Sequence, residues 1–330
     1  MSARLIGALL LAAAYAAGGA DAPYEWRLPR GFPVPAVPAD NPMSDAKVAL
    51  GERLFYEPRL SVTGRHSCAS CHDPARAFTD GRGRAAGATG ETLAHSSMAL
   101  VNVAYNVSFG WSRPDVRSLE AQMLQPLLNE HPLELGLNGR EAALMRELGA
   151  DAAYGRAFAA AFAGEEAPVS FGNLVKAIAA FERTLLSGSS PFDRYVFAGE
   201  HDALSSEARA GMSLFFSSRT GCADCHSGFN FSGSWVDAQG ATGEPSFADN
   251  GTGVRLRVPT LRNIAVTAPY MHDGRFASLD AVLDHYSEAG RAARGATKLR
   301  PMSVSAEERR SLLAFLDSLT DPAFLAARAR

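Results

Sequence analysis

Two stretches of the chain, "CASCH" at residues 68–72 and "CADCH" at residues 222–226, decide the fold. Both have the pattern Cys-x-x-Cys-His, in which two thiols can form thioethers with the vinyl groups of a haem while the next histidine ligates the iron. The two motifs use all four cysteines of the 330-residue chain. Two disulfides, a redox-active Cys-x-x-Cys pair or half of a zinc site are the alternatives. Two complete motifs with no cysteine left over favour two covalent c-type haems.

Each motif predicts three residues that hold one haem. The attachment residues are Cys68, Cys71 and His72 for the first haem, and Cys222, Cys225 and His226 for the second. The adjacent histidine is expected on one side of each iron, so the group on the other side decides the chemistry of each haem.

The first 22 residues have the pattern of a secretory signal peptide. Arg4 precedes an apolar run from Leu5 to about Ala17, and residues 20–22 read Ala-Asp-Ala, which fits a signal-peptidase site. The run is too short for a comfortable transmembrane helix, and no later segment could span a bilayer. We therefore expect a periplasmic protein with no membrane span in the mature chain. The net charge of −3 and the absence of a basic stripe argue against a nucleic-acid partner.

An internal repeat places one haem motif in each half of the chain. The pattern Gly-x-x-Leu-Phe precedes both motifs, at residues 51–55 and 211–215. Downstream, "ALVNVAYN" matches "TLRNIAVT" and "SLEAQ" matches "SLDAV"; these segments are 99–106, 260–267, 118–122 and 278–282. We predict a mainly α protein built from two cytochrome c-like helical domains that are related by duplication. The expected divisions are a signal peptide (1–22), an N-terminal domain with an open-site haem (23–188) and a C-terminal domain with a six-coordinate haem (189–330).

Local patterns predict where several elements lie. Apolar periodicity indicates helices over 45–56 and 169–188, and a closing helix over 305–322. Ser305 is the expected N-cap of the closing helix, with Glu308 as its capping-box partner. Residues 228–253 are rich in Gly, Ser, Asp and Asn, which predicts a loop.

Tyr286 is the residue at which the two halves become unequal. It lies on the apolar face of the helix predicted for "SLDAVLDHYSEAG" (278–290), eight residues after the serine of the repeat. The matching position in the first half is Pro126. A tyrosinate can ligate iron and a proline cannot, so the second haem is expected to be six-coordinate and the first to keep an open position. The other candidate ligands of the second haem are His285, Met271 and Met302.

These stretches resemble the bacterial dihaem cytochrome c peroxidase / MauG superfamily over nearly the whole mature chain. The resemblance is carried by "LGERLFYEPRLSVTGRHSCASCHDP", "SLEAQMLQPL", "GCADCH" and "VPTLRNIAVTAPYMHDGRFASLDAVLDHY". The peroxidase branch has a methionine where this chain has Tyr286, and MauG has a tyrosine. That branch also has a histidine that caps the first haem at rest, and its ungapped match here is Ala88. Both departures point to the MauG side, and "DNPMSDAKVALG" and "NEHPLELG" further resemble MbnH-type enzymes, which oxidise a partner protein.

The resemblance implies roles for residues around both haems. Glu134 matches the distal acid–base residue that moves a proton between the two peroxide oxygens. Gln122 and Pro126 match other distal-pocket positions, and Trp111 matches the tryptophan between the haems. A bridging Ca²⁺ would use Ser96, Thr267 and Pro269, where Ser96 replaces an asparagine and offers a weaker oxygen ligand. Arg262 and Arg275 are candidates to pair with haem propionates.

The function that the resemblance implies is that of a MauG-like dihaem c-type oxidase. Such an enzyme uses H₂O₂ to build a high-valent, two-iron oxidant for Trp or Tyr residues of a periplasmic partner protein. The alternative is a dihaem cytochrome c peroxidase that reduces H₂O₂ to water with electrons from small c-type cytochromes or cupredoxins. A third alternative is a dihaem electron carrier with two six-coordinate irons. MauG also has a tryptophan just ahead of its second motif, whereas "RTGCADCH" (219–226) has no aromatic residue, so a protein substrate needs another route.

Overall fold

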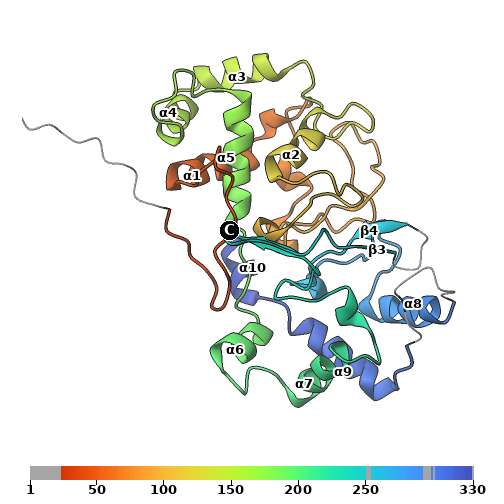
Figure 1. Ribbon diagram of the computed structural model, residues 1–330. Helices are drawn as coiled ribbons and strands as arrows, with labels where there is room; N and C mark the ends of the chain where they lie inside the picture. The colour runs from red at the N-terminus through yellow and green to blue at the C-terminus, as the bar shows by residue number, and fades with distance from the viewer. Residues whose placement is uncertain (1–23, 250–253, 293–298, 300–301, 329–330) are drawn as a thin grey trace, which may run out of the picture.

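A computed structural model describes residues 24–249, 254–292, 299 and 302–328. The predicted signal peptide lies outside these residues. The chain forms two groups of helices, one above the other in Figure 1, with the C-terminal helix between them. No helix in the described part is both long and apolar enough to cross a membrane. The helices are α1 (Asp45–Phe55), α2 (Leu119–Leu128), α3 (Glu141–Ala150), α4 (Ala152–Ala161), α5 (Phe171–Arg183), α6 (Pro191–Ala198), α7 (Ser206–Phe215), α8 (Leu279–Ala292), α9 (Ala306–Asp317) and α10 (Pro322–Arg328).

Each group is built around one close helix crossing, and the two crossings are alike. In the first, Gly51 of α1 lies against α5, where an added Cβ would be 1.9 Å from the Ala177 carbonyl oxygen. In the second, Gly211 of α7 lies against α9, where an added Cβ would be 1.8 Å from the Ser311 carbonyl oxygen. Only a residue without a Cβ permits this approach. The repeated Gly-x-x-Leu-Phe pattern is therefore the helix-crossing site of both halves, and the predicted mainly helical, duplicated fold is confirmed.

Two separate apolar cores follow from these crossings. The first is formed by buried side chains between Leu50 and Leu185, and the second by buried side chains between Phe192 and Leu319. Phe324 of α10 packs in the first core although it lies near the end of the chain. The C-terminal helix therefore returns to the N-terminal half, and Figure 1 shows it next to the lower end of α5.

The second half differs from the sequence prediction in two places. The described part of the predicted loop, residues 228–249, contains strands: β1 (Trp235–Asp237) pairs antiparallel with β2 (Gly240–Thr242). The strand β3 (Phe247–Asp249) pairs antiparallel with β4 (Arg255–Arg257), which lies beyond the predicted loop. Residues 250–253 lie outside the described residues. The expected closing helix, 305–322, is observed as α9, which ends at Asp317, followed by a separate helix, α10. Asp321 accepts a hydrogen bond from Phe324 N–H at 3.0 Å at the start of α10. The predicted capping box of Ser305 and Glu308 is present.

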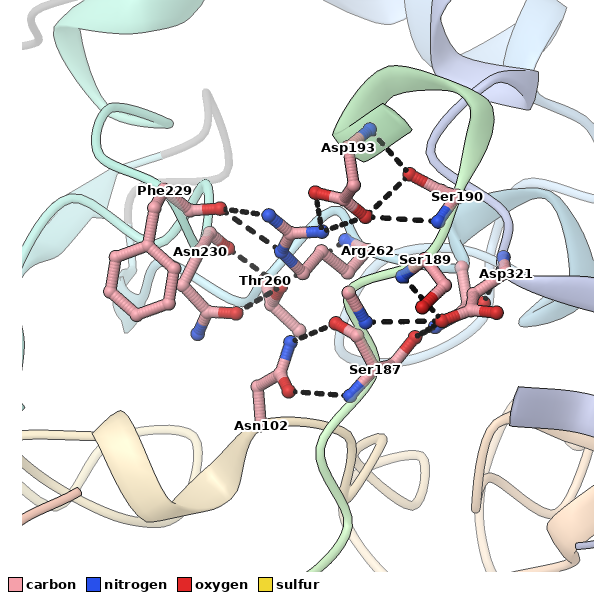
Figure 2. A network of polar contacts seen from close by, with 12 residues as sticks. Asn102, Ser187, Ser189, Ser190, Asp193, Phe229, Asn230, Thr260, Arg262 and Asp321 are labelled. Atoms are coloured by element: carbon pink, nitrogen blue, oxygen red, sulfur yellow. Dashed lines mark hydrogen bonds and ion pairs between the residues drawn. The ribbon is translucent and has the colours of Figure 1, made fainter. Parts of the chain in front are cut away.

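The two halves are joined by a buried polar network around residues 187–193 (Figure 2). Asn102 and Asn263, the matched asparagines of the repeat, are fully buried and both have left-handed backbones, with φ of 58° and 60°. Asn102 exchanges two hydrogen bonds with the backbone of Ser187. Asn263 donates to the Ser187 hydroxyl and accepts from Asp321 N–H. Ser187 thus connects the same element of both repeats.

Candidate haem sites

His72 and His226 are held in the same way in the two halves. The Nδ1 atom of His72 lies 2.8 Å from the Phe78 carbonyl oxygen, and that of His226 lies 3.0 Å from the Phe231 carbonyl oxygen. A carbonyl can only accept, so Nδ1 is the donor in each of these contacts, and Nε2 is the nitrogen that could ligate an iron. Burial lowers the pKa of both imidazoles, which favours the neutral form that binds a metal.

The cysteine residues also fit covalent haem attachment. Each Cys-x-x-Cys segment forms one turn of 3₁₀ helix, at Cys68–Ser70 and Cys222–Asp224, so both thiols stand on a short, fixed element. None of the four cysteines is joined to another in a disulfide. The donors of a c-type haem site are therefore present twice: two thiols and one imidazole with an available Nε2.

The second haem motif opens into a mostly apolar cavity of about 250 Å³. Cys222, Cys225, His226 and Tyr286 all line this cavity. Tyr286 lies on α8, and burial raises the pKa of its phenol above the usual value of 10. A bound cation favours the deprotonated ligand, so the phenol would ionise on coordination.

The structure also places the alternative ligands of the second haem. Met271 and Met302 line the same cavity as Tyr286. His285 is not one of the cavity-lining residues, and its ring contacts Phe276 and Tyr286 instead, with centroids 5.1 and 5.6 Å apart. The geometry therefore brings three of the four candidate side chains to the cavity, with Tyr286 as the one that can supply an anion.

Pro126 lies beside the segment that contains Glu134. The helices α2 and α8 begin alike, since Ser118 and Ser278 each accept a hydrogen bond from the backbone N–H three residues later. Pro126 lies inside α2, where it lacks the N–H that would bond to the carbonyl of Gln122. The Pro126 carbonyl accepts from Leu135 N–H at 2.9 Å, which positions the segment with Glu134 beside α2.

Glu134 is in an environment suited to proton transfer. Its carboxylate interacts electrostatically with the thiol of Cys71, which places it near the first haem motif. Burial raises the pKa of Glu134 above its usual value, so the carboxyl group keeps its proton to higher pH than a surface glutamate. The Glu134 carbonyl accepts a hydrogen bond from Ala88 N–H at 2.7 Å. Ala88, the position matched to the capping histidine of the peroxidase branch, is therefore bound to the Glu134 segment.

Trp111 lies between the halves in a cluster that the sequence did not reveal. Its indole N–H donates to the Ser96 carbonyl at 2.9 Å, and its ring contacts the imidazoles of His95 and His272, each 6.3 Å away between centroids. The two imidazoles contact each other at 5.4 Å. Trp111 and His272 both line the cavity of the second haem motif. His95 and His272 are unremarkable in the sequence, because nothing local indicates that they meet.

The candidate calcium residues come together, although their donor set is weak. Ser96, Thr267 and Pro269 all line the cavity beside Trp111. The Ser96 hydroxyl already donates to the Met271 carbonyl at 3.3 Å. Within the described ranges, no group of three or more His, Cys, Asp or Glu side chains could hold a metal ion. A calcium ion here would depend on backbone and hydroxyl oxygens alone, without the carboxylates that most such sites use.

The two candidates to pair with haem propionates, Arg262 and Arg275, are both paired with carboxylates of the protein. Arg262 is 1% exposed, and its guanidinium binds both carboxylate oxygens of Asp193 at 2.8 and 2.9 Å and the Phe229 carbonyl (Figure 2). Arg275 is paired with its neighbour Asp273. Both guanidinium groups form ion pairs with carboxylates of the protein, and Arg262 belongs to the polar network at the junction between the halves.

Comparisons with known proteins identify relatives of this chain. A family model described as di-haem cytochrome c peroxidase matches residues 45–202. Methylamine utilization protein MauG of Methylorubrum extorquens is 36% identical over 304 residues, which cover 89% of this chain and 83% of that protein. Cytochrome-c peroxidase IdrP1 of Denitromonas iodatirespirans is 34% identical over an alignment of 361 residues, which covers 96% of this chain and 92% of that protein. The crystal structure of a MauG-like protein associated with microbial copper homeostasis has a TM-score of 0.85 at 36% identity, covering 93% of this chain and 99% of that one.

Proposed function

The chain belongs to the di-haem cytochrome c peroxidase family, and from that premise we propose that it is a MauG-like oxidase that uses H₂O₂ to oxidise Trp or Tyr side chains of a partner protein. The observation that carries the proposal is the unequal pair of Tyr286 and Pro126. Tyr286 lines the cavity that contains His226, whereas the equivalent helix position in the first half is a proline that offers no ligand atom. When bound, the two haems supply the iron centres at which peroxide is reduced and oxidising equivalents are held.

The residues of the first site are proposed to hold the first haem and to transfer a proton during the reaction of peroxide. Cys68, Cys71 and His72 would hold the first haem. Glu134 then acts first as base and afterwards as acid: its carboxylate takes a proton from one peroxide oxygen, and the carboxylic acid so formed delivers that proton to the other oxygen. Because burial raises the pKa of Glu134, the carboxyl group gives up its proton less readily than a surface glutamate. Gln122 and Pro126 shape the surroundings of the bound peroxide.

Trp111 is proposed to pass electrons between the two halves. Its indole N–H donates to a backbone carbonyl, which cannot take the proton away. The side chain can therefore give and regain an electron without losing its hydrogen bond. His95 and His272 pack against the ring and hold it in place.

Tyr286 is proposed to make the second site suited to storing oxidising equivalents. Cys222, Cys225, His226 and the Tyr286 phenolate would hold the second haem. A phenolate carries a negative charge and the thioether of a methionine does not. Negative charge next to a metal favours its more positive state, so Tyr286 favours oxidation at this site more than methionine would.

The ligand assignment is tested on the haem-loaded ferric protein by electron paramagnetic resonance. One high-spin and one low-spin signal are expected, and Tyr286→Phe should convert the low-spin signal to high-spin. Tyr270→Phe is the matched control, because Tyr270 is also buried and lines the same cavity. Two low-spin signals in the wild type, or an unchanged low-spin signal in Tyr286→Phe, would refute the assignment. In the second case Met302→Leu and Met271→Leu would identify the ligand.

The choice of substrate is tested by adding H₂O₂ together with candidate periplasmic partner proteins. Mass spectrometry of the partner should find oxygen addition or cross-links at Trp or Tyr residues. Reduced cytochrome c is tested in parallel, since relatives of this chain include cytochrome-c peroxidases. Fast oxidation of cytochrome c without modification of any partner would favour the peroxidase that reduces H₂O₂ to water.

Export and calcium binding are the two remaining parts of the proposal. We propose that residues 1–22 direct the chain to the periplasm, where it would meet H₂O₂ and the partner protein. N-terminal sequencing of the mature protein tests the cleavage after Ala22. Ca²⁺ at Ser96, Thr267 and Pro269 stays a prediction. Calcium analysis before and after chelation would decide it, with the spectrum of the second haem as an independent measure.

A further inference from the structure

Trp235 packs directly on the loop that follows the second haem motif. Gly228, two residues after His226, has a left-handed backbone with φ of 76°. A Cβ on Gly228 would lie 2.4 Å from the indole ring of Trp235, so the ring rests against the bare backbone of this glycine. The indole is thus in van der Waals contact with the chain beside the proposed iron ligand.

A second link ties the same two segments together. Gly233 N–H donates to the Ser227 carbonyl at 3.1 Å. A Cβ on Gly233 would lie 2.9 Å from the Cys225 carbonyl oxygen, so backbone packs on backbone here as well. Residues 233–235 therefore follow residues 225–228 closely, with hydrogen-bond and packing contacts between them.

Trp235 also reaches the surface. It is half-buried and is the first residue of β1, and its cross-strand partner is the exposed Thr242 of β2, whose residues are all exposed. At the far end of β1, Ala238 N–H donates to the carbonyl of Val34, a valine that is 41% exposed. The indole therefore packs on Gly228, two residues after His226, and belongs to a hairpin whose second strand is exposed.

The neighbouring aromatic residues are less suited to carry an electron. Phe229 contacts Trp235 with ring centroids 5.5 Å apart, but a phenyl ring is much harder to oxidise than an indole. Tyr105 lies next along this row, 4.9 Å from Phe229, and its hydroxyl donates to the Pro33 carbonyl at 2.7 Å. A carbonyl cannot accept the proton that a tyrosine loses on oxidation. An indole can lose an electron and keep its N–H proton, so Trp235 needs no base.

We propose that Trp235 is the surface relay through which a partner protein is oxidised, in place of the tryptophan that MauG has ahead of its second motif. This inference rests on the proposed function, because H₂O₂ is the oxidant. H₂O₂ takes up two electrons and two protons to give two waters. Trp235 passes the electrons inward one at a time, towards His226, and regains each from a Trp or Tyr side chain of the partner. The partner side chain loses the two electrons, and the protons it releases balance those taken up.

The test uses the haem-loaded protein and H₂O₂ without any partner, so that the electrons must come from the protein itself. Peptide mass spectrometry should find oxygen addition at Trp235 severalfold above that at Trp26. Trp26 is the matched internal control, because it is also half-buried and would be equally damaged by a diffusing oxidant. Equal oxidation of the two tryptophans would overturn the relay.

Variants of Trp235 provide a second measurement, the decay rate of the oxidised absorption spectrum, which a purely structural role of Trp235 would not affect. After H₂O₂ addition, the oxidised absorption spectrum should decay severalfold more slowly in Trp235→Phe than in the wild type. Trp235→Tyr should restore much of the decay, and Trp26→Phe should have no effect. A wild-type decay rate in a folded Trp235→Phe protein would overturn the relay while the proposed function stands. If H₂O₂ leaves the ferric spectrum of the wild type unchanged, the proposed function falls and the relay with it.

Discussion

Replacing Gly51 or Gly211 with alanine tests whether the two helix crossings hold the halves together. The added Cβ would lie 1.9 Å from the Ala177 carbonyl oxygen in the first case and 1.8 Å from the Ser311 carbonyl oxygen in the second. Ordinary contact begins at 3.4 Å, so each pair of helices must separate by 1.5 or 1.6 Å. Both crossings are backbone against backbone, which leaves no flexible side chain to move aside.

The magnitude follows from two opposing terms. Overpacking of this kind costs about 3 kcal/mol, the upper end of the usual range, and the better helix propensity of alanine returns about 1 kcal/mol. The net loss is therefore about 2 kcal/mol. For a cytochrome half of this size, roughly 2–4 °C is lost per kcal/mol, so the unfolding midpoint of the altered half should fall by about 4–8 °C.

The assay is thermal unfolding of the haem-loaded protein, with the haem content determined from absorbance. Gly155→Ala is the matched control, since Gly155 lies inside α4 and an added Cβ would meet its nearest neighbour at an ordinary 3.5 Å. This variant should gain about 0.5–1 kcal/mol. Wild-type midpoints for both Gly51→Ala and Gly211→Ala would show that the crossings do not limit stability.

Three further changes test buried charges. Burial raises the pKa of Glu182 from 4.5 to about 8. The protonated side chain therefore contributes fully to stability below pH 4.5, and this contribution is lost as the pH rises to about 8. Glu182→Gln should flatten this fall in the free energy of unfolding, which urea denaturation measures across the same pH range. Asp193→Asn leaves the buried Arg262 without its anion and should lower the free energy of unfolding by about 3–5 kcal/mol, and an unchanged denaturation midpoint would contradict the ion pair. Glu134→Gln should slow H₂O₂ consumption by about 10²–10⁴-fold while the ferric spectrum stays that of the wild type, and an unchanged rate would exclude Glu134 as the acid–base group.

Prediction from the sequence was most accurate where the pattern is local. The helix expected over 45–56 is observed as α1 (Asp45–Phe55), because its apolar period and the Ser44 cap act within a few turns. The loop expected over 228–253 was only partly right, because short hairpins of Gly and polar residues have little hydrophobic alternation to reveal them. The ion pair of Arg262 with Asp193 was not predicted, because an isolated arginine in the sequence does not indicate its partner and Asp193 approaches it only in the folded chain.

The sequence by itself determined the haem attachment motifs, the duplication and the glycines of the two crossings, since covalent spacing and repeats are local properties of a chain. The tertiary structure alone decided which distant groups meet. It brought Tyr286 to the cavity of His226, joined His95 and His272 around Trp111, and set Trp235 against Gly228. The physical reason is that these contacts depend on how loops and helices pack on one another, and no short pattern of residue types encodes that packing.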